Sequence, residues 1–352
     1  MNNTITKISK KEIREFNRLL GLLTISNIPI IDSIELILKQ LTNENFKTVV
    51  KDILSSLKSG KSLSASFKRH NNLFSDIYIA NLIVAEETGN LSDVLFEYNK
   101  FEEKFEELTN KITQAARYPL FVIVVSAAVI LFMLLFLIPT LKSLFLNSKS
   151  QIPAITDFLL SISNYLQDNY LFIIIAVIAG LFFCNRMIKT PYFKENISDK
   201  LLIKLPVISS IYLKNVLARF SLSMSILLRN NVTLVEALKY SKNITDNSIF
   251  RTDINLIIKD LLKGNKLTQR IQKSVFFDYT FTKLLSAGEE SAELENVFSL
   301  ISDFYTKEFD NDLNKITSLI EPVLILFVGV IVAVILIAMY LPMFELIDHL
   351  GV

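Results

Sequence analysis

The sequence predicts an all-α membrane protein with two repeated cytoplasmic antiparallel helical-bundle modules and three transmembrane helices. Three observations lead to this class: apolar runs of membrane-spanning length, an internal repeat, and the scarcity of strand signals. Hydrophobic residues make up 51% of the 352 residues, which excludes a disordered chain. Charged residues make up 20%, too many for a chain that lies wholly in lipid, so polar modules must accompany the spans.

Two runs have the length of a membrane helix. Residues 120–138 and 323–341 each contain 19 residues without a charge, close to the roughly 20 needed to cross a bilayer core. A third run, 170–188, is apolar as far as Cys184 and can extend with Arg186 reaching the headgroups. The alternative for this shorter run is a buried or interfacial helix. We expect three spans.

The distribution of basic residues orients these spans. Lys and Arg number 16 in residues 1–119 and 19 in 185–322, but only two in 139–169 and none after 341. Because basic residues near the spans stay inside, the two large polar regions are expected to be cytoplasmic. The N-terminus is then cytoplasmic and the C-terminus external, and the first 20 residues lack the apolar core of a cleavable signal peptide.

The predicted organisation follows from these assignments. In chain order it is a cytoplasmic helical module 1 (10–119), transmembrane helix 1 (120–138), an external loop (139–169), transmembrane helix 2 (170–188), a cytoplasmic linker with helical module 2 (189–322), transmembrane helix 3 (323–341) and an external tail (342–352).

The region 16–139 recurs at 220–342 with an almost constant offset. The pairs that define the offset are Phe16 with Phe220, Gly60 with Gly264, Glu86 with Glu289, Pro119 with Pro322, and Pro139 with Pro342. Apolar residues within each copy recur at spacings of three and four, which predicts helices that bury one face. The glycines follow helix-like runs and are expected to end helices in the left-handed conformation.

Composition also excludes several kinds of site. A net charge of +2 with interspersed charges gives no basic excess for direct nucleic-acid binding. One cysteine, Cys184, and two histidines, His70 and His349, exclude a disulfide scaffold and a zinc enzyme. We therefore expect no metal and no cofactor.

A seven-residue motif occurs in both copies of the repeat. It reads AEETGNL at 85–91 and GEESAEL at 288–294, and further motif residues stand at the predicted membrane entries and at the start of the second copy. The residues that carry the pattern are Glu86, Glu87, Thr88, Gly89, Leu91, Tyr118, Pro119, Arg219, Phe220, Gly288, Glu289, Glu290, Ser291, Leu294, Glu321 and Pro322.

Taken in order and duplicated, these motifs resemble the type II secretion system F family, the inner-membrane platform proteins of type II secretion, type IV pilus and competence pseudopilus systems. The resemblance covers nearly the whole chain and departs from the family at Ala85 and Ala292, where glycine is usual, and in a short N-terminus. It implies a non-enzymatic protein of the bacterial inner membrane that couples a cytoplasmic hexameric ATPase to the extraction and polymerisation of pilin-like subunits. Implied partners are that ATPase, pilins or pseudopilins, other inner-membrane assembly proteins, membrane lipid and further copies of the chain.

The paired acids of the motif have two open interpretations. Glu86 and Glu87 are unfavourable as catalytic carboxylates, because adjacent helical residues point in different directions and no nucleophile or histidine shares the motif. They can cap the helix that begins near Leu91 or pair with a base, or they can contact a partner. The sequence leaves both roles open.

Two other segments each have more than one possible role. The stretch 101–107, FEEKFEE, is expected to be a solvated face, with contact to a basic partner or a divalent cation as the alternatives. The sequence SGKS at 59–62 resembles the end of a phosphate loop but lacks its first glycine, so a helix cap is favoured over ATP binding.

The turn after the motif differs between the copies, with Gly89 in one and Ala292 in the other. We expect Gly89 to adopt a left-handed conformation, which penalises a Cβ atom. Ala292 is then expected to keep a negative φ, so that replacing it with glycine would destabilise the protein slightly.

A small transporter or channel built from two parallel repeats is the alternative function, and a membrane receptor is a further one. A pore needs polar or ionisable lining, which the predicted spans scarcely provide. A receptor would ordinarily place a sizeable domain outside, whereas the predicted outside holds only a loop and a short tail.

Overall fold

The computed structural model describes residues 8–140, 154–188, 190, 199–206 and 208–350. Every regular element in these ranges is helical, which confirms the predicted all-α class. Two compact units divide the chain, one made of Met1–Asn110 with Asp199–Asp310 and the other of Lys111–Ser198 with Asn311–Val352. The first unit contains both copies of the soluble module and the second contains the apolar helices.

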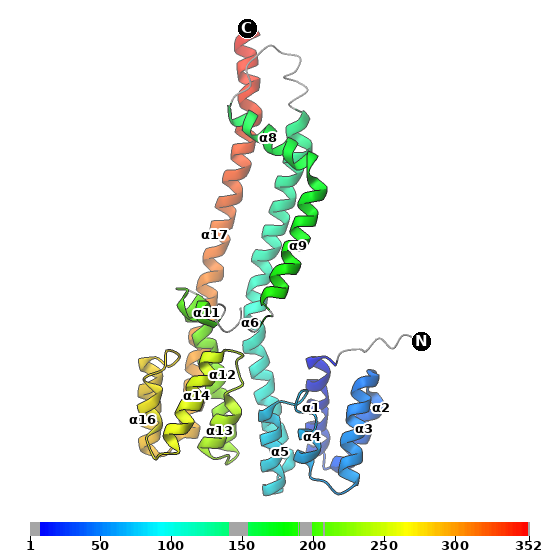
Figure 1. The fold of residues 1–352 in the computed structure, drawn as a ribbon, viewed down its shortest axis with the longest axis vertical. Coiled ribbons are helices and arrows are strands. Elements are labelled where there is room, and N and C mark those ends of the chain that lie inside the picture. The colour runs from blue at the N-terminus through cyan, green and yellow to red at the C-terminus, as the bar shows by residue number, and fades with distance from the viewer. Residues whose placement is uncertain (1–7, 141–153, 189, 191–198, 207, 351–352) are drawn as a thin grey trace. The chain divides into compact units, whose positions relative to one another are not determined.

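The first unit repeats one series of helices (Figure 1). Module 1 consists of α1 (Lys10–Ile25), α2 (Ile30–Gln40), α3 (Glu44–Lys58), α4 (Leu63–Lys68), α5 (Asp76–Thr88) and the first turns of α6 (Leu91–Phe132). Module 2 consists of α11 (Asp199–Lys204), α12 (Ile208–Arg229), α13 (Leu234–Ser241), α14 (Ser248–Leu261), α15 (Leu267–Ile271), α16 (Tyr279–Ser291) and the first turns of α17 (Leu294–Leu350). Helices α1–α6 correspond in order to α12–α17, as the sequence repeat predicts.

Side chains at the N-termini show why helices begin where they do. Ser9 and Glu12 form a reciprocal capping box at α1. Asn43 caps α3, and its repeat partner Asn247 caps α14 in the same way. Each side chain accepts hydrogen bonds from N–H groups that have no partner within the helix.

The cores of the two modules are built from phenylalanine. Phe16 and its repeat partner Phe220 are 1% and 0% exposed and each lies at the centre of an aromatic cluster. The neighbours are Phe46, Phe67 and Phe74 in module 1, and Phe250, Phe277, Phe281 and Phe298 in module 2. Ring centroids 5.6–6.4 Å apart around each central ring fit the favourable range for aromatic pairs. The predicted buried stripe is confirmed.

Left-handed residues end corresponding helices. Gly60 and Gly264 both have φ of +84° two and three residues after the ends of α3 and α14, which confirms the predicted helix stops. Ser62 then caps α4 through the N–H of Ala65, so the SGKS sequence forms the connection between two helices. Asn27 and Asn231 also share positive φ, at 59° and 58°. The repeat therefore extends to backbone conformation.

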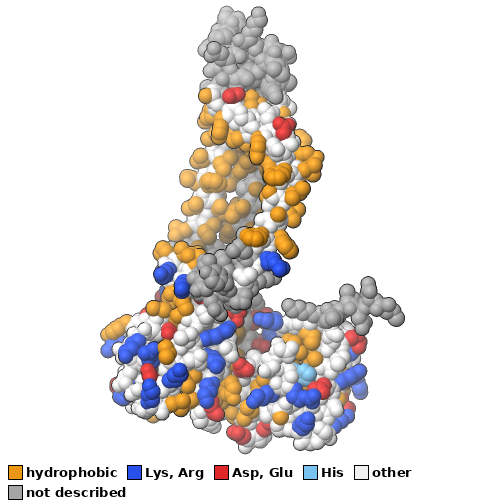
Figure 2. Space-filling view, viewed as in Figure 1, with side chains coloured by type: hydrophobic (Ala, Val, Ile, Leu, Met, Phe, Trp, Pro, Cys, Tyr) orange, Lys and Arg blue, Asp and Glu red, His pale blue; other side chains and the backbone are white. Residues whose placement is uncertain are grey.

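The second unit contains the apolar helices. Helices α6 and α17 run without interruption through Pro119 and Pro322, and α9 (Tyr170–Ile188) has the bounds expected for the middle span. Hydrophobic side chains gather on the surface of this unit (Figure 2). By length and composition α6, α12 and α17 each qualify as membrane-crossing, and α8 with α9 qualifies as a bent pair. Because α12 contributes 11 buried residues to the core of module 2, we assign the three spans to α6, α9 and α17.

A further helix lies in the segment expected to be an external loop. Helix α8 (Ala154–Asp168) packs against η1 (Met133–Leu137), a π-helical stretch that follows α6, and against α17. The buried residues of this contact are Leu134, Ile138, Leu159, Leu160, Ile335 and Ala338. Residues 141–153 of the expected loop lie outside the described residues. The expected tail is helical as far as Leu350, where α17 ends.

Candidate functional site

The duplicated acid of module 1 binds the start of a neighbouring helix. Glu86 lies in the last turns of α5, and its carboxylate accepts hydrogen bonds from the backbone N–H of Leu63 and, at 2.5 Å, from the hydroxyl of Ser64. Both donors belong to the first turn of α4, whose free N–H groups and dipole favour a negative charge. Of the roles that the sequence left open, Glu86 does not take that of capping the helix beginning near Leu91, because its carboxylate bonds to the start of the earlier helix α4.

Glu289 repeats this contact in module 2. Its carboxylate accepts from the N–H of Leu267 at 2.7 Å, from the N–H of Thr268 at 3.2 Å and from the hydroxyl of Thr268 at 2.7 Å. Lys266, the residue at the N-cap position of α15, offers no side-chain cap. Glu289 therefore supplies the cap of α15 from a distant part of the sequence.

The turns that follow the motif have the same backbone conformation. Gly89 has φ of +69°, as expected, but Ala292 also lies in the left-handed region, with φ of +59°. The expectation of negative φ at Ala292 is wrong. Its N–H bonds to the carbonyl of Gly288 and the N–H of Glu293 bonds to the same carbonyl, which fixes the C-terminal turn of α16 despite the cost of the Cβ atom.

This geometry predicts opposite effects at the two turns. Gly89→Ala should destabilise the turn by about 1 kcal/mol, because a Cβ at positive φ is strained even though no atom lies within 4 Å of it. Ala292→Gly should stabilise its turn by roughly 0.5 kcal/mol, because the strain relieved exceeds the entropy gained by the unfolded chain. Hydrogen exchange of amides flanking each turn, measured on the full chain in detergent, tests both. Effects of the same sign would contradict the assignment.

The other residues of the motif serve packing and turn formation. A Cβ on Gly288 would lie 2.7 Å from the side chain of Val297, so only glycine permits the observed approach of α16 and α17. The hydroxyl of Thr88 donates to the carbonyl of Val84, and that of Ser291 donates at 3.5 Å to Gly288. Leu91 and Leu294 are half-buried first residues of α6 and α17.

The second acid of each motif is available to solvent. Glu87 and Glu290 are exposed at the ends of α5 and α16, next to the capping residues Glu86 and Glu289. Glu290 accepts a 3.4 Å hydrogen bond from Ser286. The structure thus separates the paired acids by their contacts: the first of each pair, exposed at Glu86 and half-buried at Glu289, bonds to a helix N-terminus, and the second presents its carboxylate to solvent.

The motif residues at the membrane entries meet in the second unit. The hydroxyl of Tyr118 donates to a carboxylate oxygen of Glu321 at 3.1 Å. Pro119 and Pro322 follow these residues inside continuous helices. In the sequence these four residues form two equivalent pairs, one in each copy of the repeat. In the structure the polar side chains of the pairs, those of Tyr118 and Glu321, are in contact.

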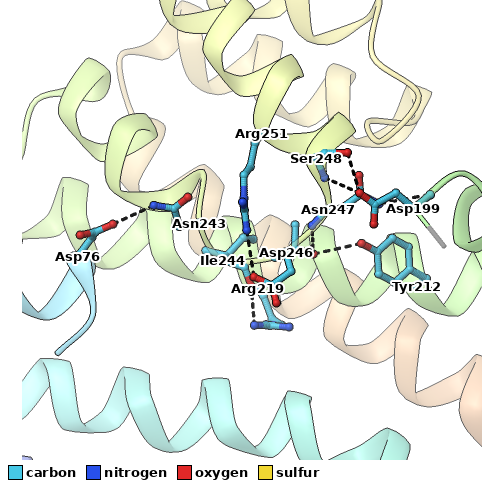
Figure 3. Close-up of polar contacts among 11 residues, drawn as sticks. Asp76, Asp199, Tyr212, Arg219, Asn243, Ile244, Asp246, Asn247, Ser248 and Arg251 are labelled. Atoms are coloured by element: carbon cyan, nitrogen blue, oxygen red, sulfur yellow. Dashed lines mark hydrogen bonds and ion pairs between the residues drawn. The ribbon is translucent and has the colours of Figure 1, made fainter. Parts of the chain in front are cut away.

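Arg219 joins the two modules within the first unit. Its guanidinium lies 4.2 Å from the ring centroid of Phe105 on α6 and donates at 2.6 Å to the carbonyl of Ile244 (Figure 3). The Nε atom is buried without a hydrogen-bond partner. Burial lowers the pKa of Arg219 to about 10, so the side chain stays cationic at neutral pH. A cation over an aromatic face is favourable when partly desolvated.

The connection between α13 and α14 contains Ile244, whose carbonyl accepts the hydrogen bond from Arg219, and several further contacts fix this connection (Figure 3). Asp199 accepts from the N–H and the hydroxyl of Ser248 at 2.8 and 2.7 Å, and the hydroxyl of Tyr212 lies 3.1 Å from that of Thr245. Asp246 accepts from Arg251 at 3.0 Å. These contacts fix the loop that module 2 presents to module 1.

Polar side chains complete the contact between the modules. Asn230 donates to the fully buried Asn81 at 2.5 Å, and Asn243 donates to Asp76 at 2.9 Å. Further contacts are the pair Lys104 with Asp303 at 2.6 Å and the donation from Asn215 to the carbonyl of Leu108 at 3.0 Å.

The contact between Asn81 and Asn230 has no equivalent in the repeat. The repeat counterparts of these residues are Leu284 and Ser26, and a leucine side chain offers no hydrogen-bonding group. This contact could not be predicted from the sequence, because neither periodicity nor the repeat marks these positions.

The acidic stretch 101–107 is only partly the solvated face that was expected. Glu102 is half-buried, accepts from Asn17 at 3.3 Å, and lies beside the ion pair of Arg14 with Glu106 at 2.5 Å. Burial raises the pKa of Glu102 to about 7, against the lowering effects of Asn17 and Arg14. Glu102, Arg14 and Arg219 line a pocket of about 600 Å³ in the first unit.

The raised pKa predicts how stability depends on pH. Because the folded pKa exceeds the ordinary carboxyl value of 4.5, the folded state binds the proton more tightly, and stability falls as pH rises from about 4.5 to 7. Glu102→Gln should remove this fall and stabilise the protein above pH 7 by on the order of 2 kcal/mol. Thermal melting across pH, with the exposed Glu103→Gln as matched control, measures the effect. Equal pH profiles for the parent and Glu102→Gln proteins would contradict it.

In the ranges that the structure describes, no group of three or more His, Cys, Asp and Glu side chains could hold a metal ion. The site is instead a set of helix corners, a contact between two modules and exposed acids, carried on helices that continue into apolar spans. These features define a multi-pass helical membrane protein with a duplicated module.

Comparisons with known proteins identify the family. The sequence profile of protein F of the type II secretion system matches residues 16–139 and 220–342, the two copies of the repeat. The chain therefore belongs to the type II secretion system F family, whose members are platform proteins of secretion and pilus assembly in the inner membrane.

Three relatives illustrate the breadth of the similarity. The chain is 29% identical to the type IV pilus assembly protein PilC of Pseudomonas aeruginosa, over 98% of this chain and 92% of PilC. It is 30% identical to PilC of Thermus thermophilus, over 97% of this chain and 84% of the relative. It is 24% identical to the type II secretion system protein F of Pseudomonas aeruginosa, over 98% and 85%.

Proposed function

We propose that the chain is a non-enzymatic inner-membrane platform that couples a cytoplasmic hexameric ATPase to the extraction and polymerisation of pilin-like subunits. One observation carries the proposal: α6 and α17 each belong both to a module and to an apolar span. No loop separates module from span in either copy. A partner that turns or lifts a module therefore acts on a membrane helix through its backbone hydrogen bonds.

The names of the relatives favour pilus assembly. Identity to the PilC proteins of two organisms is 29% and 30%, against 24% to protein F of type II secretion. We therefore assign the chain to a type IV pilus machine, or to the related filament of a competence system, ahead of a secretion pseudopilus.

We assign contact with the ATPase to the exposed acids Glu87 and Glu290. Their carboxylates lie at equivalent corners of the two modules, whereas Glu86 and Glu289 are occupied by helix N-termini. A basic surface on the ATPase would complement them, and reversal of charge at such a contact opposes association.

Co-purification tests this assignment. The full chain in detergent should retain the organism's assembly ATPase and its pilin-like subunits, and Glu87→Lys with Glu290→Lys should reduce ATPase retention while the protein still accumulates in the membrane. Glu103→Lys, an exposed acid elsewhere on module 1, is the control and should bind normally. Undiminished retention by the double variant would remove these acids from the contact, and absence of both partners from the parent protein would contradict the platform function.

The proposed orientation has the N-terminus in the cytoplasm and the C-terminus outside. In a background lacking Cys184, a cysteine at Ser150 should react with an impermeant maleimide in spheroplasts, because it lies in the segment poor in basic residues. A cysteine at Leu262, which is 69% exposed in module 2, should react only after lysis. Labelling of Leu262 from outside would overturn the orientation.

A further inference from the structure

Two prolines interrupt the hydrogen bonding of the apolar helices near the ends of the predicted spans. Pro139 and Pro342 have no N–H, so the carbonyls four residues earlier, those of Leu135 and Ala338, lose their usual donors. These carbonyls occupy equivalent positions in the two copies of the repeat. An unsatisfied carbonyl in hydrocarbon costs several kcal/mol, and such groups in membrane helices need substitute donors.

A third carbonyl is freed by the π-helical stretch. In η1 the N–H of Ile138 bonds to the carbonyl of Met133, five residues earlier, instead of to that of Leu134. The next possible donor to Leu134 would be residue 139, which is proline. The carbonyl of Leu134 is therefore also without a donor from its own helix.

Side chains of α8 donate to all three carbonyls. The hydroxyl of Thr156 donates to Ala338 at 2.6 Å, that of Ser163 donates to Leu134 at 2.5 Å, and the amide of Gln167 donates to Leu135 at 3.2 Å. Thr156 and Ser163 are fully buried in this contact. Because these carbonyls lie within or next to the predicted spans, α8 lies at the depth of the ends of two membrane helices (Figure 1).

The surface of α8 that does not pack against η1 and α17 has two faces of different character. One stripe is apolar and recurs with helical spacing at Ile155, Phe158 and Tyr165, of which Phe158 and Tyr165 are 64% and 62% exposed. A second stripe is polar and mostly exposed, and it consists of Asp157, Ser161, Asn164 and Asp168. A helix with one apolar and one polar free face fits a bilayer interface, with the apolar face in the acyl region.

The direction of α8 agrees with this placement. Its axis is bent by 77° from that of α9, which follows after one residue. If α9 crosses the bilayer, α8 runs close to the membrane plane, the orientation of an interfacial helix. The helices that α8 packs against also carry exposed apolar side chains, among them Phe136 and Ile337, which are 64% and 55% exposed.

We propose that α8 is a helix embedded in the membrane interface, whose apolar stripe binds lipid acyl chains while its buried hydroxyls replace the hydrogen bonds removed by Pro139 and Pro342. The proposal rests on the membrane location of the chain and is independent of its role in filament assembly. Segment 139–169 is then in part a membrane element, whereas the sequence alone predicts an external loop.

Spin labelling of the full chain tests where α8 lies. Single cysteines at Phe158 and Asp157, in a background lacking Cys184, are labelled with a nitroxide in phosphatidylcholine vesicles. We expect the label at 158 to collide with oxygen more than with a water-soluble nickel chelate, as at Val124 in the span, and the label at 157 to show the reverse, as at Leu262. Chelate preference at both sites would overturn the proposal. A label at 158 inaccessible to both reagents would also overturn it, because protein would then cover the stripe.

A second experiment tests the hydroxyls. Thr156→Val and Ser163→Ala together should raise the hydrogen-exchange rate of α8 amides in vesicles by roughly tenfold, the equivalent of about 1.4 kcal/mol. Thr156→Ser with native Ser163 keeps both donors and should leave exchange near that of the parent. Unchanged exchange in the double variant would refute the role of the hydroxyls, whatever the depth measurement shows.

Discussion

Replacing Glu289 with lysine is expected to open the corner at α15 by about 3 kcal/mol or more. The change removes the acceptor of three hydrogen bonds and places a positive charge against the N-terminus of a helix. Glu86→Lys should have a similar effect on α4. Hydrogen exchange of the amides of Leu267 and Thr268, measured on the full chain in detergent, reports the opening directly.

The neighbouring acid provides a matched control. Glu290→Lys makes the same chemical change one residue away, at an exposed side chain, and should leave the exchange of the α15 amides unchanged. Equal protection in the Glu289→Lys and parent proteins would show that the carboxylate adds nothing to the corner. The duplicated Glu86 and Glu289 would then have to be explained by partner contact alone.

Phe220→Ala is expected to destabilise module 2 by about 3–5 kcal/mol, a large part of the stability of a typical domain. The ring is fully buried and contacts four other phenylalanine rings, so its loss leaves a cavity that the surrounding residues can fill only in part. Thermal melting followed by circular dichroism in detergent measures the loss of helix.

Two variants separate packing from other causes. Phe220→Leu keeps most of the volume and should cost clearly less, whereas Leu262→Ala, at a side chain 69% exposed, should be close to neutral. A neutral Phe220→Ala variant would contradict a packing role for this motif residue. Arg219→Ala, at the adjacent position, should instead weaken the contact with Phe105 and Ile244 between the modules.

Much of the fold could be predicted because local patterns repeat. The helical class, the pairing of Phe16 with Phe220, the helix stops at Gly60 and Gly264 and the bounds of the 170–188 helix all follow from periodicity, length and glycine chemistry. The wrong expectation at Ala292 also came from a local rule. Alanine ordinarily prefers negative φ, but the hydrogen bonds that end α16 impose the left-handed turn at this position.

The sequence indicated which residues belong to the site, but not which groups they contact. Duplication marked Glu86 and Glu289, yet their partners lie more than 20 positions away, and no spacing rule connects a carboxylate to a distant helix start. Glu102 was expected on a solvated face, because the sequence cannot show that Asn17 of α1 packs beside it.

The sequence by itself determined the helices, the repeat, the apolar spans and the family, since each depends on local composition or on similarity along the chain. Only the tertiary structure decided which polar groups meet: Asn81 with Asn230 between the modules, and Thr156 with the carbonyl freed by Pro342. The physical reason is that a buried polar atom must find a partner wherever packing places one, and that partner is set by distance in space rather than by position in the chain.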